Sequence, residues 1–516
     1  MQTYSYHIFY FPFRWSMKGN SRKNFSEQVD LSQIPISSCS RWERMQLDTS
    51  APMDGDVAGG QTEACELFAE RQYFYDFVHP VLYDIKGETD PLIYHFERKE
   101  PKEKVVKYVI CVKGRNYVLK VDAINLNLYA TGVGVLSFFL ANREESQKDR
   151  NSVLTINQFG RRIMPPHAKE FSDSDRTMIA SSIALEGLDG MPGVYSDAFD
   201  YKLDARGEEE RGLNTVWQPA RFIENLIADL SAELRVKAVI DDRMLVNCWY
   251  ANQDLADAVK YNRFSRSFDN GDFWYKYVYV DTPDFETCQE EEMKDSLLKS
   301  ATYGRWRNFG TLFGVSRYSF VVLTDEGEFN RDVLSMHMRT IYSRMFELVI
   351  VQRASMLRFS AEVTKVGALQ GVSRREVAYR IGSVYKEYIR FINQVFFRSI
   401  TSQDQGIELY EFLLKQFNAY DQIKDLDSEI DELYRYATLL VDQKRSENGD
   451  KLNFLAAIFL PATVLSGFFG MNPFEGTGHN ADMLEQGALI VVVSVIVYYL
   501  IMKCLRLSIC CCIILI

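Results

Sequence analysis

The 516-residue chain lacks the short sequence patterns by which many enzymes are recognised. It contains no P-loop, no H-E-x-x-H and no G-x-S-x-G sequence, which hold phosphate, zinc or a nucleophilic serine in the enzymes that use them. Its nine cysteines are scattered and form no C-x-x-C pairs with the spacing of zinc ligands. We therefore expect no catalytic residues, with a membrane-anchored enzyme as the alternative.

An excess of positive charge is also missing. The chain has 59 Lys and Arg against 70 Asp and Glu, a formal net charge of −11. This balance argues against direct nucleic-acid binding, which relies on basic side chains at the phosphates. The apolar start Tyr4–Trp15 is interrupted by His7, Pro12 and Arg14, so it predicts a strand and not a secretory signal. We expect the soluble part to be cytoplasmic and its cysteines reduced.

Charge is absent from one long segment near the C-terminus, Leu452–Gly470. A helix needs about 20 apolar residues to cross a bilayer, and this segment nearly reaches that length. A polar turn with Gly470-Met471-Asn472 follows, and a second apolar segment spans about Gly487–Met502. The sequence therefore predicts a hairpin of two membrane-spanning helices.

Basic residues border this hairpin on one side only. They are Lys444, Arg445 and Lys451 before the first segment, and Lys503 and Arg506 after the second. The connecting loop, Asn472–Gln486, contains Glu475, Asp482 and Glu485 and no Lys or Arg. Because positive flanks remain inside, we expect both termini in the cytoplasm and two spans in the cell (inner) membrane.

The first 330 residues alternate short strand and helix patterns, which predicts an α/β or α+β domain. The predicted strands are Tyr4–Trp15, Val105–Val112, Tyr117–Val121, Ile124–Tyr129, Met244–Tyr250, Trp274–Val280 and a pair within Phe313–Thr324, and the predicted helices are Glu66–Tyr83 and Arg221–Leu234. The G-x-G in Thr131–Phe138 has two interpretations: a phosphate-binding loop or, because a third glycine is missing, a glycine bulge between strands.

From about Asn330 the pattern becomes helical, with predicted helices at Leu334–Glu362 and Arg374–Phe397. Apolar residues then recur with heptad spacing at Ile423, Leu426, Ile430, Leu433, Ala437 and Leu440. With no strong breaker after Ile407, we expect one helix over Ile407–Gly470, on the order of 96 Å long at 1.5 Å per residue. Such a helix needs copies of itself or other partners along its length.

The segment FLPATVLSGFFGMNPFE resembles the C-terminal region of the CorA family of magnesium transport proteins. It shares an apolar helix with Pro461, Thr463 and Gly467, followed by the Gly-Met-Asn triplet, after a long charged helix. The resemblance implies a homopentameric funnel that passes divalent cations, most simply magnesium, across the bilayer; an unrelated two-span anchor is the alternative. The implied organisation is a cytoplasmic domain at 1–330, a helical stalk at 331–450, a first span at 451–472, an outer loop at 473–486, and a second span with tail at 487–516.

In a CorA-like ring, one face of the first span lines the pore. The implied pore residues are Leu452, Ala456, Leu460, Thr463, Gly467, Gly470, Met471 and Asn472. Asn472 amides and Gly470 carbonyls would hold a hydrated magnesium ion, which loses water reluctantly; alternatively, Asn472 only caps the helix. Asp427 and Asp431 are candidate regulatory metal ligands, or part of a solvated helix face.

Three features depart from the family pattern: Pro473 directly after the triplet, a tail with few basic residues, and the long front domain. The three tail cysteines are apolar membrane residues or lipidation sites.

Some CorA-like proteins encoded beside type III CRISPR systems act as antiviral membrane effectors that respond to a nucleotide messenger, an S-adenosylmethionine–AMP conjugate. The long front domain is similar to theirs, which gives the alternative of a nucleotide-gated effector.

Overall fold

The computed structural model describes most of the chain. The described residues are 2–17, 31–37, 40–49, 63–100, 104–163, 179–189, 193–199, 219–240, 243–261, 269–367, 373–470, 485, 488–489, 492–493, 495–496 and 499. The chain divides into two compact units. The first is Met1–Ala368 with Ser383–Asp431, and the second is Leu369–Gly382 with Glu432–Ile516.

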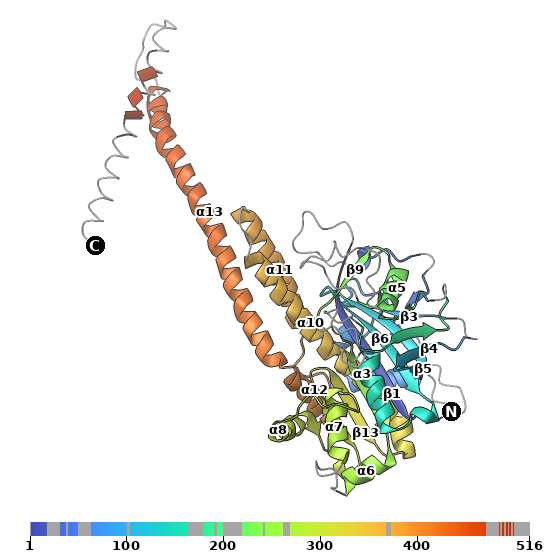
Figure 1. Ribbon diagram of the computed structural model, residues 1–516. Helices are drawn as coiled ribbons and strands as arrows, with labels where there is room; N and C mark the ends of the chain where they lie inside the picture. Colours follow the sequence, from blue (N-terminus) through green and yellow to red (C-terminus); the bar gives the residue numbers. More distant parts are fainter. Residues whose placement is uncertain are drawn as a thin grey trace. The chain divides into compact units, whose positions relative to one another are not determined.

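The first unit is built on one large sheet, which contains 13 strands within the described residues (Figure 1). The strands are β1 Ser5–Met17, β2 Trp42–Arg44, β3 Ile93–Arg98, β4 Lys107–Val112, β5 Arg115–Tyr129, β6 Val133–Asn142, β7 Ser182–Glu186, β8 Ser196–Asp197, β9 Leu234–Ala238, β10 Leu245–Ala251, β11 Thr302–Tyr303, β12 Leu312–Val315 and β13 Ser319–Thr324. Their order is β11-β12-β13-β10-β1-β6-β5-β4-β7-β8, with β2 on β3, β3 on β5 and β9 on β1. The β10–β13 pair is parallel, and the other pairs found in the described chain are antiparallel.

Strand β1 lies at the centre of this sheet and is buried on both faces. Phe9, Phe11 and Phe13 alternate into the main core, whereas Tyr10 packs edge-on against Phe346 on the opposite face. Pro12 is tolerated inside the strand because of its position. β6 pairs along one edge of β1. Along the other edge, β10 pairs only as far as Tyr10 and β9 begins only at Phe13. Pro12 lies in the gap between β10 and β9, where its missing N–H costs no ladder hydrogen bond.

Helices cover both faces of the sheet. The α-helices within the described residues are α1 Glu63–Tyr73, α2 His79–Leu82, α3 Arg150–Gly160, α5 Arg221–Leu230, α6 Gln253–Lys260, α7 Asp269–Tyr279, α8 Glu291–Ala301, α9 Ser335–Arg339, α10 Ile341–Gly367, α11 Arg374–Gln394, α12 Asp404–Gln416 and α13 Ala419–Gly470. Helix α3 packs on β4 and β10, α6 and α7 pack on β13, and α10 packs on β1 and β6. The mixed α/β domain followed by long helices agrees with the predicted fold class.

Three predicted elements are wrong. The single helix Glu66–Tyr83 is interrupted where Tyr75 becomes extended and donates its N–H to the Ile400 carbonyl. Trp274–Val280 lies mostly in α7 and is not a strand. Its aromatic composition favours a strand, but helical spacing places Phe273, Trp274, Tyr277 and Val278 together in the core.

The third error concerns the long C-terminal helix. The chain leaves α12 at Gln416 and adopts a left-handed conformation at Asn418, with φ +53°. Asparagine tolerates this conformation better than most residues, and a new helix, α13, starts at Ala419. Helix α13 has 52 residues, so it is about 78 Å long and shorter than the predicted helix.

The G-x-G stretch is not a phosphate-binding loop. Gly132, with φ +73°, turns the chain between β5 and β6. Gly134 lies within β6, where a Cβ atom would be 2.4 Å from the ring of Phe13. The two glycines are therefore explained by a turn and by close packing.

Helix α13 is the main described element of the second unit. Met471, Asn472, most of the loop at 473–486 and most of the predicted second span lie outside the described residues. Within the part of the chain that the structure describes, no helix combines the length and the apolar character required to cross a membrane.

Candidate functional sites

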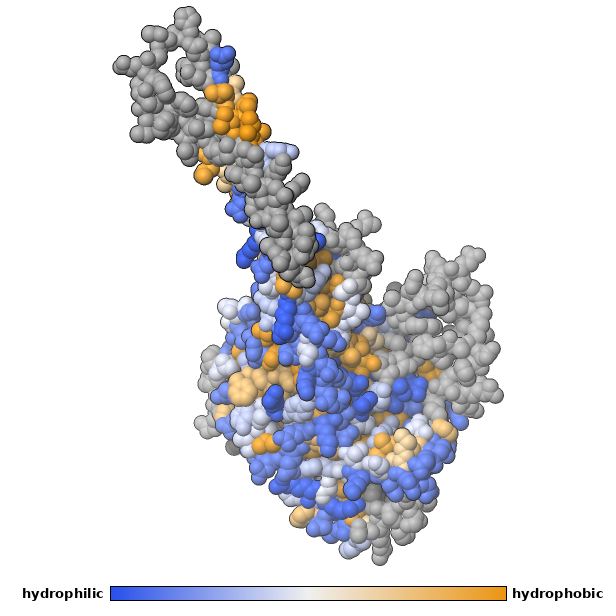
Figure 2. All heavy atoms as spheres, turned by 90° about the vertical axis from the view of Figure 1, so that its left-hand side faces the viewer, coloured by the Kyte–Doolittle hydropathy of each residue, from blue (hydrophilic) through white to orange (hydrophobic). Residues whose placement is uncertain are grey.

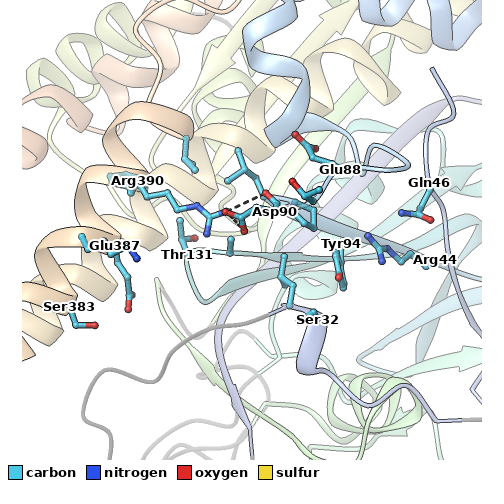
Figure 3. Close-up of a pocket in the computed structure, with 18 residues that line it drawn as sticks. Ser32, Arg44, Gln46, Glu88, Asp90, Tyr94, Thr131, Ser383, Glu387 and Arg390 are labelled. Carbon is cyan, nitrogen blue, oxygen red and sulfur yellow. Dashed lines mark hydrogen bonds and ion pairs between the residues drawn. The ribbon is translucent and has the colours of Figure 1, made fainter. Parts of the chain in front are cut away.

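A cavity of about 630 Å³ lies in the first unit, between α11 and the β3 side of the sheet (Figure 3). Its lining residues are mostly polar and carry charges of both signs: Leu31, Ser32, Arg44, Gln46, Glu88, Thr89, Asp90, Pro91, Leu92, Tyr94, Ala130, Thr131, Ser383, Lys386, Glu387, Arg390, Phe391 and Val395. Sequence reasoning missed this site because its walls come from segments about 300 residues apart.

Ion pairs organise the walls of the cavity. On the sheet side, Arg44 donates two hydrogen bonds, of 2.6 and 2.8 Å, to the buried Asp84 carboxylate and lies 3.4 Å from the centre of the Tyr94 ring. Across the cavity, Arg390 of α11 pairs with Asp90 at 2.9 Å, as Figure 3 shows. This pair joins α11 to the loop that precedes β3.

The predicted pore residues lie on the last part of α13. Leu452 and Leu460 are 67% and 65% exposed, and Ala456, Thr463 and Gly467 are exposed as well. Spacings of four and seven residues place most of this set on one helical face. The Thr463 hydroxyl donates to the Phe459 carbonyl at 2.8 Å, so in this single chain it is occupied by its own helix.

Exposed apolar side chains occur all around this part of α13. Besides Leu452 and Leu460, they include Phe454, Leu455 and Phe459, and hydrophobic residues gather toward this end of the helix in Figure 2. Leu452 and Phe454 point to nearly opposite sides, because consecutive residues are rotated by about 100°. A helix that is hydrophobic on every side is typical of a buried or lipid-embedded element.

The heptad residues earlier in α13 behave differently. Leu426 and Ile430 are each 2% exposed, and Ala437 and Leu440 are also buried. These four residues are thus covered within one chain. That the helix needs copies or partners along its length stays a prediction. Other apolar side chains of the stalk stay exposed, among them Leu439 at 67%.

The candidate regulatory carboxylates Asp427 and Asp431 lie one turn apart on α13. Asp427 is exposed and accepts a hydrogen bond of 3.2 Å from the Tyr388 hydroxyl of α11. Among the described residues of a single chain, no group of three or more His, Cys, Asp or Glu is placed to hold a metal ion. A site here would therefore need ligands from elsewhere.

Comparison with known proteins agrees with this geometry. Residues 330–505 match the family described as CorA-like Mg2+ transporter protein. This part of the chain is similar to the CorA-like family, and we call residues 330–505 the CorA-like region. The CorA-like region begins where the helical segment of the structure begins, at Asn330, and includes all of α10, α11, α12 and α13. A comparison with curated proteins found no match.

The first long helix of the CorA-like region, α10, is tied to the sheet by buried charges. Glu347 accepts hydrogen bonds from Asn127 at 2.5 Å and from Tyr129 at 2.9 Å, both on β5. Burial raises the pKa of Glu347, and these two hydrogen bonds offset part of the increase. One turn earlier, Arg344 pairs with Glu70; burial alone would lower the pKa of Arg344, but the Glu70 carboxylate raises it.

Further hydrogen bonds link the Glu347–Asn127 contact to the cavity wall. Asn127 is 2.5 Å from the His95 ring, and the His95 backbone N–H donates to Asp84 at 3.2 Å. Asp84 in turn holds Arg44. The polar network therefore runs from the cavity to Glu347 in the CorA-like region.

A second buried cluster resembles a nucleophile with its base. His7 is 2.8 Å from the Ser5 hydroxyl, 2.7 Å from Asn157 and 3.4 Å from the Cys248 sulfur. All four side chains are buried. Burial lowers the pKa of His7 to about 4 and raises that of Cys248 to about 12. A neutral, buried thiol is a poor nucleophile, and the cluster is explained as polar core packing.

Proposed function

We propose that the protein is a CorA-like channel of the cell membrane that passes divalent cations, with magnesium as the main cargo. The observation that carries the proposal is the family match over residues 330–505, with α13 ending in a segment whose apolar side chains are exposed in the single chain. Burying this segment in lipid removes its apolar surface from water, which is favourable in proportion to the area buried.

The orientation follows from charge. Basic residues border the two apolar segments, whereas the loop between them is acidic, so the termini and the large first unit lie in the cytoplasm. The acidic loop residues, Glu475, Asp482 and Glu485, then face outward and raise the local concentration of cations.

Two spans from one chain cannot enclose a water-filled path, so the channel requires a ring of copies, and the family relation favours a homopentamer. In such a ring, Leu452 and Leu460 form apolar constrictions that gate by excluding water. Asn472 and the Gly470 carbonyl supply neutral oxygens at the outer mouth, where a magnesium ion can bind with its water shell retained. Met471 completes the triplet at this mouth.

Substitution of Asn472 tests the pore. We expect Asn472→Ala to reduce Mg²⁺ entry by about tenfold or more in proteoliposomes loaded with a Mg²⁺-sensitive dye, because such a loss corresponds to about 1.4 kcal/mol of lost binding at the mouth. Asn480→Ala, in the same loop, is the matched control and should transport normally. Equal transport by both variants and the unaltered protein would refute the assignment, as would a purified protein that is monomeric in detergent.

Regulation by cytoplasmic magnesium is a second part of the proposal. Asp427 and Asp431 share one face of α13, and a ring of copies would bring several such carboxylates together as oxygen ligands for Mg²⁺. We expect the double substitution Asp427→Asn and Asp431→Asn to weaken inhibition of transport by internal Mg²⁺. Unchanged inhibition would leave these carboxylates as solvated surface.

A second candidate function is a membrane effector of type III CRISPR defence that a nucleotide messenger of the S-adenosylmethionine–AMP type opens. The observation that favours it is the cavity in the first unit. Binding of a labelled messenger to the full-length protein, followed by ion leakage from proteoliposomes, would support this function. Messenger-independent Mg²⁺ transport without messenger binding would exclude it.

A further inference from the structure

The charges around the cavity are nearly all satisfied within the protein. Arg44 pairs with Asp84, Arg390 with Asp90, and Arg358 with the cavity residue Glu387 at 2.7 Å. Two lining residues of opposite sign, Lys386 and Glu88, form no ion pair with any other residue in the described part of the chain. Both side chains are exposed to solvent, so the cavity presents one ammonium and one carboxylate that are free to pair with a ligand.

We propose that this cavity binds a small zwitterionic molecule, whose anionic group pairs with Lys386 and whose cationic group pairs with Glu88. Binding does not depend on the proposed transport function, whereas any effect of the ligand on ion flow rests on it. A ligand with a single charge would pair with only one of the two groups and so gain less binding energy.

The two charged groups lie on different walls. Lys386 is on α11, one turn before Arg390 on the same side of the helix, so an anionic group at Lys386 is also near the Arg390 guanidinium. Glu88 is in the loop before β3, beside Asp90. Glu88 is exposed, but some loss of hydration and the nearby Asp84 and Asp90 carboxylates raise its pKa, and a ligand cation would relieve this repulsion.

The remaining lining suits a small organic molecule. A volume of about 630 Å³ is within the range of roughly 300–1,000 Å³ that is usual for such sites. Leu92 and Phe391 offer apolar contact. Figure 3 shows Ser383, Glu387 and Arg390 on one side of the cavity and Arg44 and Tyr94 on the other, so a bound molecule would bridge α11 and the sheet.

Calorimetric titration of the full-length protein in detergent tests the proposal. The probes are phosphocholine and phosphoethanolamine, which carry both charges, glycerol 3-phosphate, which carries only the anion, and choline, which carries only the cation. We expect at least one zwitterion to bind about tenfold more tightly than either singly charged probe, a difference of about 1.4 kcal/mol.

Substitutions then assign the two contacts. Lys386→Gln and Glu88→Gln should each weaken zwitterion binding about tenfold, while Lys299→Gln and Glu292→Gln, exposed elsewhere on the first unit, should leave it unchanged. The proposal is overturned if neither zwitterion binds below about 10 mM, a threshold equivalent to under about 3 kcal/mol. Equally tight binding of glycerol 3-phosphate, or binding that Lys386→Gln and Glu88→Gln do not alter, would also overturn it. Failure of transport in the same sample would affect the proposed channel and not this site.

Discussion

Strand β1 and the end of α13 are both rich in apolar residues, but the chain covers only one of them. Phe9, Phe11 and Phe13 are fully buried between helices of the same chain, whereas Leu452 and Phe459 are 67% and 62% exposed. The apolar side chains of the first region are buried within a single chain. The second has an apolar surface that no described part of the chain covers, and this is the physical reason for our proposal that it lies in lipid beside other copies.

The largest effect on stability should come from removing one partner of a buried ion pair in the first unit. Arg344→Ala leaves the buried carboxylates of Glu70 and Glu347 without their cation. We expect the free energy of unfolding of the first unit to fall by about 3–5 kcal/mol, as when one partner of a buried ion pair is removed.

Thermal unfolding monitored by circular dichroism provides the measurement. Arg344→Lys keeps the charge and should retain part of the stability. An Arg344→Ala protein that unfolds at the same temperature as the unaltered protein would show that the Arg344 ion pair does not stabilise the first unit.

A charged residue introduced into the exposed apolar end of α13 tests whether lipid surrounds this segment. Phe459→Arg should disfavour membrane insertion by about 2.5–3.5 kcal/mol, the cost of arginine near the centre of a spanning helix. Leu439→Arg is a matched control, since Leu439 is about as exposed as Phe459, at 67% against 62%, but lies earlier in α13.

The two variants are compared by the fraction of protein that stays in alkali-washed membranes. Only Phe459→Arg should decrease it. A similar decrease for both variants, or for neither, would mean that the segment after Lys451 is not distinguished from the stalk by contact with lipid.

Glycines provide a smaller test of the same contrast. In the packed sheet, Gly134→Ala would place a Cβ atom 2.4 Å from the Phe13 ring, and we expect a loss of about 1–3 kcal/mol from overpacking. In α13, an added Cβ at Gly449 meets nothing within 4 Å. Gly449→Ala should therefore stabilise the helix by about 0.5–1 kcal/mol. Unfolding curves of the two variants should shift in opposite directions, and a shift in the same direction would contradict the contrast.

The smallest expected effect is a pH dependence from the core of the first unit. The folded state keeps His7 neutral down to a pKa of about 4, while the unfolded chain binds a proton below its ordinary pKa of about 6.5. Stability is therefore lost as the pH falls from about 6.5 toward 4, because the unfolded state binds more protons in that window. Between pH 7 and pH 5.5 we expect His7 to contribute a loss of about 1 kcal/mol.

The contribution of His7 is isolated by comparison with His7→Asn. The variant should be less stable at pH 7 but lose less stability on acidification. Parallel pH profiles for the two proteins would assign the dependence to other groups.

Sequence patterns predicted best where a single physical cause dominates. Alternation predicted β1, and heptad spacing identified four residues of α13 that are buried: Leu426, Ile430, Ala437 and Leu440. The break at Asn418 was missed because asparagine is only a weak helix breaker. Helix α7 was mistaken for a strand because aromatic residues suit either element. The cavity could not be found at all, since Arg390 and Asp90 meet only in the folded chain.

The position of α10 limits how this protein can be divided. The family match starts at residue 330, yet Ile350, Val351 and much of the rest of α10 are fully enclosed by the first unit. A fragment that begins at that boundary would expose the apolar side chains of α10 to water. The remaining part would lose the helix that packs on β1 and β6. Chimeras that exchange the first unit for a domain of another protein should therefore join beyond Gly367.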